Sequence, residues 1–400
     1  MKAAADAFRA KPRHMPKHAS SRSSSPQKKA YFAQIADGLE AMGAAELAGL
    51  GAIRPHPVRR GIHFTADLET LYRITYCTRL CTRILRPLKS FACPDAKAIY
   101  RAAETLDWSR YISPDQTFAV FASTAGSTVP HSQFAGLTLK DAVADQFRIG
   151  FGRRPNVDPN APDLWINLFI HKDQGTISVD ASGGSLHRRG YRTASVDAPM
   201  QETVAAAMVQ FSGWNGEKPL MDPMCGSGTL VIEAAMAFCS IPAGYLRKSF
   251  GFQRFPGYDP DLWTSVKAEA DQKIRNLPGG LIFASDKDAA AVAATRENVK
   301  AFSSFRAIEV LGRNIHDIQH LGPHVILMNP PYGLRMKDTA PLADFYRRLG
   351  DFLKQHCKGS EAYLYFGDRS LIKQMGLKAE WKKPLRNGGL DGRVVKYAMY

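Results

Sequence analysis

The chain has 400 residues, of which 45% are hydrophobic, and this length exceeds what a single core usually serves, so two or more domains are predicted. No stretch approaches about 18 uninterrupted apolar residues, which argues against a membrane-spanning helix and favours a soluble globular chain. Lys and Arg total 53 against 37 acidic residues, a formal net charge of +16, and such a surplus favours a polyanionic partner.

The six cysteines are not arranged like a metal site or a disulfide framework. There is no CxxC pair, no histidine at zinc spacing and no secretory signal, so the sequence predicts reduced thiols, no bound metal and a cytoplasmic location. Cys77 and Cys81 are one helical turn apart, a spacing that core residues show more often than metal ligands do.

Residues 1–29 are rich in Ser, Lys and Arg and poor in large apolar groups. Eight basic residues and one acidic residue precede Tyr31, so this segment carries a charge of +7. Without apolar groups to bury, it is predicted to be a disordered tail that adds nonspecific affinity for RNA. An organellar transit peptide is the alternative, although a clear amphipathic helix is lacking.

Residues 30–185 alternate short strand-like and helix-like patterns. The first is a strand followed by a helix over 31–52, whose apolar face is formed by Leu39, Met42, Leu47 and Leu50. The other predicted elements are strands over 61–67, 117–123 and 164–182, the last folded as a hairpin, and helices over 69–86 and 137–150. Helices on one face of an antiparallel sheet predict one or two ferredoxin-like RNA-binding platforms in this α+β region.

Residues 186–400 begin with a basic connector and then alternate helix and strand to the end of the chain. Strands are predicted over 219–223, 280–286, 307–312, 324–330 and 361–368, with helices over 201–214, 228–238 and 287–302. This rhythm predicts a Rossmann-like α/β domain with a doubly wound, mostly parallel sheet. Ligands of such sheets bind at the carboxyl ends of the strands.

The stretch DPMCGSGT places Asp222 at the end of a strand and Gly226 and Gly228 in the turn before a helix. Glycines let the backbone approach a ligand closely, and a helix N-terminus offers unpaired N–H groups to an anionic moiety. A tight turn without a ligand is the alternative. Leu230 and Val231 stand where a dinucleotide fingerprint would have its third glycine, so a nicotinamide cofactor is disfavoured.

Asp286 ends the next predicted strand, where a carboxylate can accept hydrogen bonds from both hydroxyls of a ribose. The alternative role is that of a helix N-cap, which an aspartate at this place would also suit. Asn314 follows the strand after that, where it could border an adenine ring or simply occupy a turn.

The stretch MNPPYG follows an apolar strand and places Asn329, Pro330, Pro331 and Tyr332 at its end. Because proline fixes its own φ and favours extended geometry before it, Asn329 and Pro330 are predicted to form a rigid array of acceptors. The Asn329 side chain and the Pro330 carbonyl could grip the two hydrogens of an exocyclic amine, while Tyr332 stacks on the base. Catalysis by such positioning needs no tuned general base.

The connector residues Arg188, Arg189, Tyr191 and Arg192 combine phosphate-binding charge with a stacking ring, so we expect them to contact RNA, with a solvated linker as the alternative. Arg335, just beyond the proline pair, is a further predicted RNA contact. A segment over 247–263 has aromatic and basic residues interleaved, and it is predicted either to touch RNA or to pack as a lid.

These motifs resemble class I S-adenosylmethionine-dependent amino-methyltransferases, in which DPMCGSGT corresponds to the first motif and NPPY to the catalytic motif. The ordered set HRRGYR, APMQETVAAAMV, DPMCGSGTLVIEAAM, SDKD and NPPYGLRM is similar to bacterial enzymes that methylate guanine N2 in large-subunit (23S) ribosomal RNA and carry a THUMP domain. The stretch over 155–173 resembles the end of a THUMP domain, so the likeness covers roughly residues 30–400.

The resemblance implies S-adenosyl-L-methionine as cofactor and assigns roles to matching positions. The glycine turn, with Asp222, Gly226, Ser227 and Gly228, would hold the methionine part. The ribose would bind Asp286, and the adenine would border Asn314, where relatives often have Asp. The amine site would consist of Asn329, Pro330, Pro331 and Tyr332.

The leading hypothesis is therefore an RNA guanine-N2 methyltransferase that acts on ribosomal RNA. Guanine and adenine present the same kind of amine, so the choice of guanine depends on the resemblance. The alternatives are a transfer RNA guanine-N2 methyltransferase, an N6-adenine methyltransferase and a noncatalytic RNA-binding assembly factor. Since a base buried in a stack is unreachable, the target nucleotide is expected to be single-stranded or flipped.

Overall fold

The computed structural model describes residues 27–129, 131–196, 199–332 and 340–400. Most of the predicted disordered tail, and the predicted RNA contact Arg335, lie outside these ranges. None of the helices within them is long and apolar enough to cross a membrane. The same residues contain no cluster of His, Cys, Asp and Glu that could hold a metal ion, and all six cysteines are free thiols.

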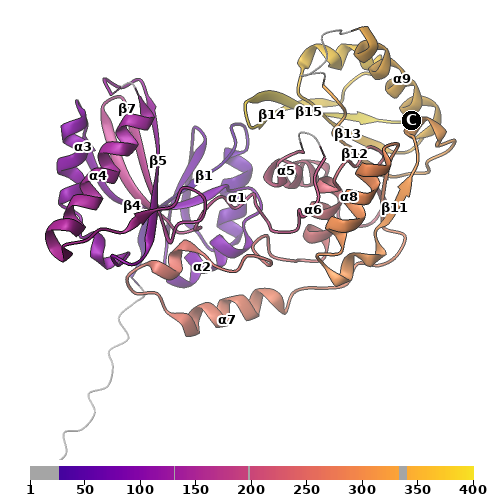
Figure 1. Ribbon diagram of the computed structural model, residues 1–400. Coiled ribbons are helices and arrows are strands. Elements are labelled where there is room, and N and C mark those ends of the chain that lie inside the picture. The colour runs from indigo at the N-terminus through magenta and orange to yellow at the C-terminus, as the bar shows by residue number, and fades with distance from the viewer. Residues whose placement is uncertain (1–26, 130, 197–198, 333–339) are drawn as a thin grey trace, which may run out of the picture.

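The N-terminal region forms one eight-stranded sheet in the order β2-β3-β1-β4-β8-β7-β5-β6 (Figure 1). Its elements are β1 (Lys29–Gln34), α1 (Glu40–Gly49), β2 (Ile53–Val58), β3 (Gly61–Ala66), α2 (Leu68–Cys77), β4 (Arg83–Ala92), α3 (Ala96–Glu104), η1 (Trp108–Arg110), β5 (Thr117–Ala125), α4 (Ser132–Phe151), β6 (Asn156–Val157), β7 (Leu164–His171) and β8 (Gln174–Asp180). The first four strands, with α1 and α2, are ferredoxin-like, and β4 joins them to the rest by pairing with β8.

Two predictions for this region need correction. The sheet is not wholly antiparallel, because β5 pairs in parallel with β6 and β7 across the long helix α4. The helix predicted over 69–86 ends at Cys77, and Arg83–Ala92 is the strand β4. Pro87 lies inside that strand next to a register shift, since proline has no N–H for a ladder hydrogen bond.

The C-terminal region forms a seven-stranded sheet in the order β11-β10-β9-β12-β13-β15-β14. Its elements are α5 (Glu202–Ser212), β9 (Leu220–Asp222), α6 (Thr229–Phe238), η2 (Gly251–Arg254), α7 (Pro260–Asp271), β10 (Ile282–Asp286), α8 (Ala289–Val299), η3 (Ser303–Ala307), β11 (Glu309–Gly312), η4 (Ile315–Asp317), β12 (Val325–Met328), α9 (Ala340–His356), β13 (Glu361–Phe366), η5 (Arg369–Met375), β14 (Trp381–Asn387) and β15 (Leu390–Ala398). The strands β9 to β13 are parallel and the pairs involving β14 and β15 are antiparallel, which confirms the Rossmann-like fold class.

An aromatic cluster joins the two regions. Phe252 and Trp263, from the segment over 247–263, pack against Tyr72 and Tyr76 of α2, and the ring centroids of Tyr72 and Phe252 are 4.4 Å apart. Phe252 is fully buried. The aromatic residues of this segment therefore pack between the domains rather than lying open to RNA, and a role of the segment as a lid stays a prediction.

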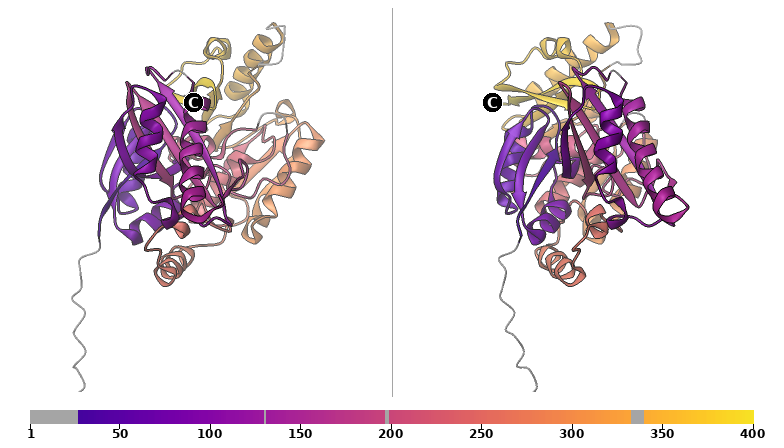
Figure 2. Two further views of the ribbon diagram at one scale, coloured as in Figure 1. Left: turned by 60° about the vertical axis from the view of Figure 1, so that its left-hand side comes forward. Right: turned by 90° about the vertical axis from the view of Figure 1, so that its left-hand side faces the viewer.

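A second contact between the regions comes from the C-terminal hairpin. Figures 1 and 2 show β14 and β15 reaching from the Rossmann-like sheet toward the N-terminal region. Gly38 faces this hairpin so closely that a Cβ atom there would lie 2.8 Å from the Pro384 carbonyl oxygen. The aromatic cluster and the hairpin are thus two of the places where the domains pack on each other.

Candidate active site

Four neighbouring strands bring the predicted cofactor and amine residues to one edge of the Rossmann-like sheet. In the order of the sheet, Asn314 follows β11, Asp286 ends β10, Asp222 ends β9 and Asn329 follows β12. The strand order reverses between β9 and β12, and open α/β sheets bind ligands at such a switch point.

The glycine turn is tied directly to the next strand. Gly226 has a φ of +54°, and its N–H donates to Asp286 Oδ2 at 3.0 Å. Gly228, with a φ of +82°, precedes α6 and packs so closely on α8 that a Cβ atom would lie 2.9 Å from Thr295 Cγ2. Both positions require glycine, because an L side chain would be strained in this backbone conformation and, at Gly228, would also clash.

Asp286 is not the helix cap that was considered as its alternative role. Asp288 caps α8 by accepting from the Ala290 N–H, while Asp286 lies at the strand end and accepts from the N–H groups of Gly226 and Asp288. A carboxylate has about four acceptor sites, so two are left for a ligand. The role of Asp286 toward a ribose stays a prediction.

Asp222 is a buried carboxylate at the centre of this edge. It is 1% exposed, and its Oδ1 accepts from the Met224 N–H at 3.1 Å. No lysine or arginine pairs with it among the residues that the structure describes. Burial, together with a smaller effect of the nearby charge of Asp286, raises the pKa of Asp222 to about 8. A buried acid without a cationic partner suits a positively charged ligand such as S-adenosylmethionine.

Asn314 and Ser227 have structural contacts in addition to their predicted roles. The Asn314 side chain accepts from the His316 N–H and caps η4, which is the turn role considered as its alternative. Ser227 is buried, and its carbonyl accepts from Asn298 Nδ2. The adenine contact of Asn314 and the methionine contact of Ser227 stay predictions.

The amine site contains an acceptor that the protein itself leaves unused. Asn329 Oδ1 is buried and has no hydrogen-bond partner in the described part of the chain. The following turn is held from α9, where the buried Tyr346 hydroxyl donates to the Pro331 carbonyl at 3.0 Å. Because leaving a buried acceptor unpaired is costly, this oxygen suits a ligand that brings its own N–H group.

Tyr332 is positioned by Tyr365 in the neighbouring strand β13 and by Gly367 directly after that strand. A Cβ atom added at Gly367 would lie 2.7 Å from Tyr332 Cγ, so the glycine makes room for the ring. The Tyr365 ring meets Tyr332 edge-on, with centroids 6.2 Å apart. Burial raises the pKa of Tyr332. The sequence analysis missed Tyr346, Gly367 and Tyr365, although a glycine directly after an apolar strand was a usable signal.

The connector between the domains corrects two predicted RNA contacts. Arg189 is 1% exposed and Tyr191 is fully buried. Arg189 pairs with Glu233 at 3.3 Å and donates to the carbonyl of Arg79 in the N-terminal domain, and the Tyr191 hydroxyl donates to Glu233. Both residues therefore hold the junction together and cannot reach RNA. The Arg189 charge and the Tyr191 ring make contacts within the protein because the two domains cover them.

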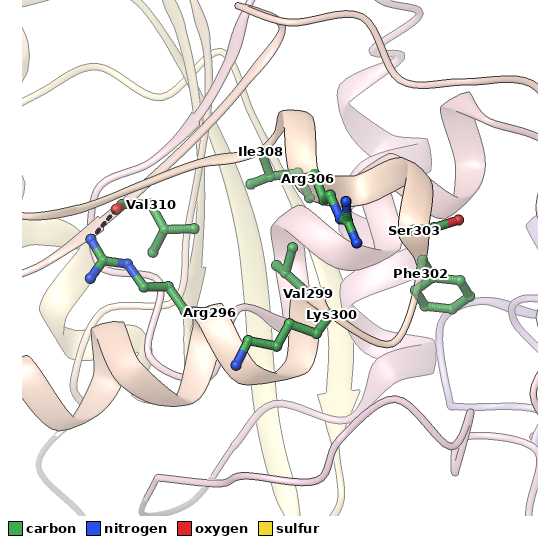
Figure 3. Close-up of a pocket in the computed structure, with 8 residues that line it drawn as sticks. All are labelled: Arg296, Val299, Lys300, Phe302, Ser303, Arg306, Ile308 and Val310. Carbon is green, nitrogen blue, oxygen red and sulfur yellow. Dashed lines mark hydrogen bonds between the residues drawn. The ribbon is translucent and has the colours of Figure 1, made fainter.

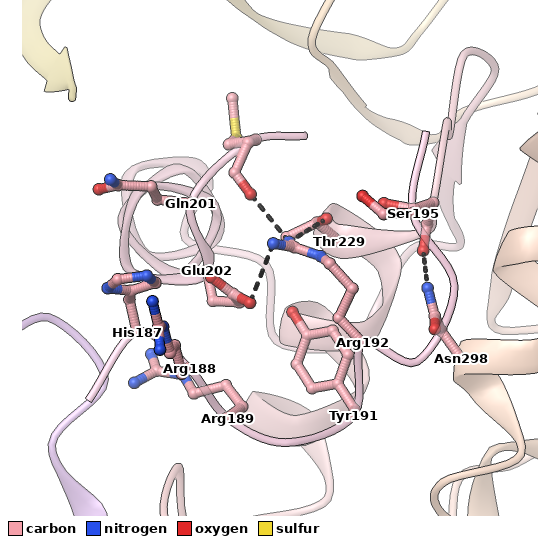
Figure 4. A network of polar contacts seen from close by, with 12 residues as sticks. His187, Arg188, Arg189, Tyr191, Arg192, Ser195, Gln201, Glu202, Thr229 and Asn298 are labelled. Carbon is pink, nitrogen blue, oxygen red and sulfur yellow. Dashed lines mark hydrogen bonds and ion pairs between the residues drawn. The ribbon is translucent and has the colours of Figure 1, made fainter. Parts of the chain in front are cut away.

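The Arg192 side chain also makes its contacts within the protein (Figure 4). Its guanidinium donates to the Met200 carbonyl and to Thr229 Oγ1, both at 2.9 Å, and pairs with Glu202 at 3.1 Å. Thr229 is the first residue of α6, so Arg192 braces the helix that follows the glycine turn. Arg188, in contrast, is exposed, and its contact with RNA stays a prediction.

Asn298 is a further site residue that the sequence analysis missed. It is fully buried in α8, and its Oδ1 accepts from the N–H groups of Thr193 and Ala194, while its Nδ2 donates to the carbonyls of Ala194 and Ser227. Figure 4 shows this asparagine facing the connector. One side chain thus ties the connector to the glycine turn with its full hydrogen-bonding capacity.

Known protein families match this chain over most of its length. The family of RMKL-like methyltransferase domains matches residues 189–396, the THUMP domain family residues 93–180 and the RlmL ferredoxin-like domain family residues 30–85.

Relatives and solved structures agree with these matches. The chain is 38% identical over 371 residues to a Synechocystis protein provisionally named an RNA methyltransferase, covering 92% of this chain and 97% of the relative. It is 38% identical over 381 residues to the ribosomal RNA large subunit methyltransferase K/L of Methylococcus capsulatus, covering 93% of this chain but 51% of the relative. The crystal structure of SMU.472, provisionally described as a methyltransferase and complexed with S-adenosylhomocysteine, has a TM-score of 0.81 and 28% identity, covering 93% of this chain and 98% of that one.

The fold and the carboxyl-edge site define a methyltransferase that uses S-adenosyl-L-methionine as cofactor, joined to a ferredoxin-like and THUMP region. The chain spans nearly all of its Synechocystis relative and about half the length of the K/L relatives. It belongs to the RMKL-like methyltransferase family, which confirms the predicted resemblance.

Proposed function

We propose that this protein transfers a methyl group from S-adenosylmethionine to the exocyclic N2 amine of a guanosine in large-subunit (23S) ribosomal RNA, acting in the cytoplasm. The observation that carries the proposal is the buried Asn329 Oδ1, which has no hydrogen-bond partner among the described residues and lies at the carboxyl edge of the sheet. The choice of RNA is supported by the THUMP match and by relatives that are named ribosomal RNA large subunit methyltransferases. The choice of guanine is supported by the resemblance of the ordered motifs.

The residues of the carboxyl edge fit the cofactor. When bound, S-adenosylmethionine supplies an electrophilic methyl group on a positively charged sulfur. The buried carboxylate of Asp222 would balance the positive charge of the methionine part, and the free acceptor sites of Asp286 would bind the ribose hydroxyls.

Asn329 and Pro330 would prepare the amine for attack. An aryl amine is a poor nucleophile because its lone pair is delocalised into the ring. Asn329 Oδ1 and the Pro330 carbonyl would each accept one amine hydrogen, which favours a pyramidal nitrogen with its lone pair aimed at the methyl carbon. The nitrogen lone pair would form the new N–C bond while the S–C bond breaks with its electron pair left on sulfur, and the nitrogen would then lose one proton to solvent.

The test is transfer of a labelled methyl group to RNA from cells that lack the gene, followed by nucleoside analysis of the large ribosomal, small ribosomal and transfer RNA fractions. We expect label in N2-methylguanosine of the large ribosomal fraction. Label in N2-methylguanosine of transfer RNA would change the substrate, and label in N6-methyladenosine would overturn the choice of base. No label in any fraction, with cofactor bound, would favour the noncatalytic alternative.

A further inference from the structure

A basic pocket lies on the Rossmann-like domain away from the carboxyl edge. It opens between the end of α8, the short helix η3 and the strand β11, and its volume is about 580 Å³, within the usual range for small-molecule sites. Figure 3 shows the residues that line it: Arg296, Val299, Lys300, Phe302, Ser303, Arg306, Ile308 and Val310.

The pocket is separate from the methyl-transfer site. The helix α8 begins after its cap Asp288, next to Asp286 at the carboxyl edge, and ends at Val299 beside the pocket. An α-helix rises about 1.5 Å per residue, so the two sites are roughly 16 Å apart along this helix. A nucleotide in the basic pocket would therefore not compete with the cofactor.

The rim of the pocket carries three cations and no acidic side chain. The exposed Arg306 has no hydrogen-bond or ion-pair partner among the residues that the structure describes. Arg296 uses one nitrogen to donate to the Val310 carbonyl at 2.8 Å, which leaves its other donors available. Lys300 pairs with Glu297 at 2.7 Å, but both side chains are more than half exposed, so this pair is weak.

The floor of the pocket is apolar. Val299, Phe302 and Ile308 line it and are each less than 10% exposed. This pocket fits a ligand whose phosphate contacts the cations of the rim and whose flat, weakly polar group lies on the apolar floor. A nucleotide has this composition, whereas a free phosphate would make no use of the floor.

One lining residue of the pocket, Phe302, packs against aromatic rings near the domain junction. The Phe302 ring lies 6.4 Å from the Tyr191 ring of the connector and 6.2 Å from the ring of Tyr245. Tyr245 is 39% exposed, so part of its ring beside Phe302 is open for a base to stack on.

We propose that this basic pocket binds an unpaired nucleotide of the RNA substrate, with the phosphate at Lys300 and Arg306 and the base or ribose on the apolar floor. The identity of the polyanion as RNA rests on the proposed function. The site is an anchoring contact that holds RNA at a distance from the methylated base.

The test compares two full-length double variants that each lose two positive charges. Lys300→Gln with Arg306→Gln alters the pocket. Lys354→Gln with Lys358→Gln is the control, on exposed residues just before β13, which β10, β9 and β12 separate from β11. Affinity for a short single-stranded RNA is measured over a series of salt concentrations, and thermal unfolding checks that each variant is folded. If the double variant is unstable, Arg306→Gln alone serves, because this side chain is exposed.

We expect the pocket variant to bind RNA several-fold more weakly and to flatten the dependence of log affinity on log salt by about 0.7 for each phosphate that the variant no longer binds. Equal effects in the control variant, or no effect in the pocket variant, would overturn the proposal. So would binding of free guanosine monophosphate at the pocket with RNA affinity unchanged, which would indicate a small-molecule site. Failure of the wild-type protein to methylate RNA would instead count against the proposed function, whatever the binding data show.

Discussion

Asn329 illustrates how much one side chain can contribute to this site. Its buried oxygen has no partner in the described residues, and it directly follows β12, the neighbour of β9, which ends at Asp222. A structural asparagine would use its acceptor inside the protein, as Asn298 does with four hydrogen bonds. The contrast between these two asparagines supports a role for Asn329 toward a ligand.

Replacing Asn329 by alanine should lower kcat by about a hundredfold or more, because only one of the two amine acceptors would remain. The affinity for S-adenosylmethionine should stay within a few-fold of wild type, as measured by titration calorimetry. The matched control is Asn314→Ala, two residues beyond β11, which should act on cofactor affinity and not on kcat. Loss of cofactor binding in Asn329→Ala would mean that the residue is structural.

Asp222 predicts a pH dependence of cofactor binding. Its pKa is raised to about 8 by burial, and only the ionised form offers a charge to a cationic ligand. Affinity for S-adenosylmethionine should therefore fall as the pH falls below 8, by at most about tenfold per pH unit. Calorimetric titrations with S-adenosylmethionine at several pH values below and above 8 would measure how the affinity changes with pH.

The raised pKa of Asp222 also makes the stability of the ligand-free protein depend on pH, in the opposite direction to cofactor affinity. Since the folded pKa of Asp222 lies above its unfolded value of 3.8, this group stabilises the fold most at low pH, and the contribution is lost as the pH rises from 3.8 toward 8. Asp222→Asn should remove both dependences. A wild-type binding curve that is flat with pH would show that another group neutralises the ligand.

The turn after β12 shows how neighbouring elements hold the segment that we propose binds the amine. The helix α9 supplies the Tyr346 hydroxyl to the Pro331 carbonyl, and the end of β13 supplies the space for the Tyr332 ring. Two prolines stiffen the chain, but its orientation is set by these packed neighbours.

Gly367→Ala should displace the Tyr332 ring, because the added methyl would lie 2.7 Å from Cγ. We expect kcat to fall by about 10- to 100-fold as the base is misplaced. Cofactor affinity should be unchanged, since Asp222 and Asp286 lie on other strands. Steady-state kinetics with RNA and a separate cofactor titration would distinguish the two effects.

The control for this substitution is Gly322→Ala, where an added Cβ would meet no atom within 4 Å. It should leave kcat and the melting temperature near wild type. Tyr346→Phe, which removes only the hydroxyl that holds Pro331, should reproduce part of the loss. A fully active Gly367→Ala enzyme would show that the position of Tyr332 does not limit the reaction.

At the scale of the whole molecule, the connector is a structural joint. Arg189 lies between Glu233 of α6 and the Arg79 carbonyl of the N-terminal domain, and Arg79 in turn donates to the carbonyls of Met236 and Ile241. These contacts, with the aromatic cluster around Phe252, place both domains in one packed unit. The position of bound RNA relative to the amine site would follow from this joint.

Arg189→Met should lower the free energy of unfolding by about 3–5 kcal/mol, because the buried Glu233 would lose its cationic partner. Denaturant unfolding would measure this loss. Arg188→Gln, one residue away and exposed, should leave stability unchanged and weaken RNA binding, with a smaller salt dependence. If Arg188→Gln reduced stability and Arg189→Met did not, Arg188 would be the structural residue and Arg189 the candidate RNA contact.

The sequence alone predicts those secondary-structure elements and strand-end residues whose local pattern fits only one structure. The alternation of apolar residues predicted β1, α1 and the parallel strands from β9 to β13, because burial on one face imposes a period on the sequence. The strand-end residues Asp222, Asp286 and Asn329 were identified by their place after apolar runs, since the carboxyl ends of parallel strands share one edge.

Tertiary structure decided the features that depend on partners distant in sequence. Arg83–Ala92 is a strand because it pairs with β1 and β8, although its local pattern continues that of the helix α2. Arg189 and Tyr191 have the composition of an RNA contact, but the two domains close over them and pair them with Glu233. Burial and pairing are properties of the packed molecule, so a charge or a ring in the sequence does not reveal whether it faces solvent or another domain.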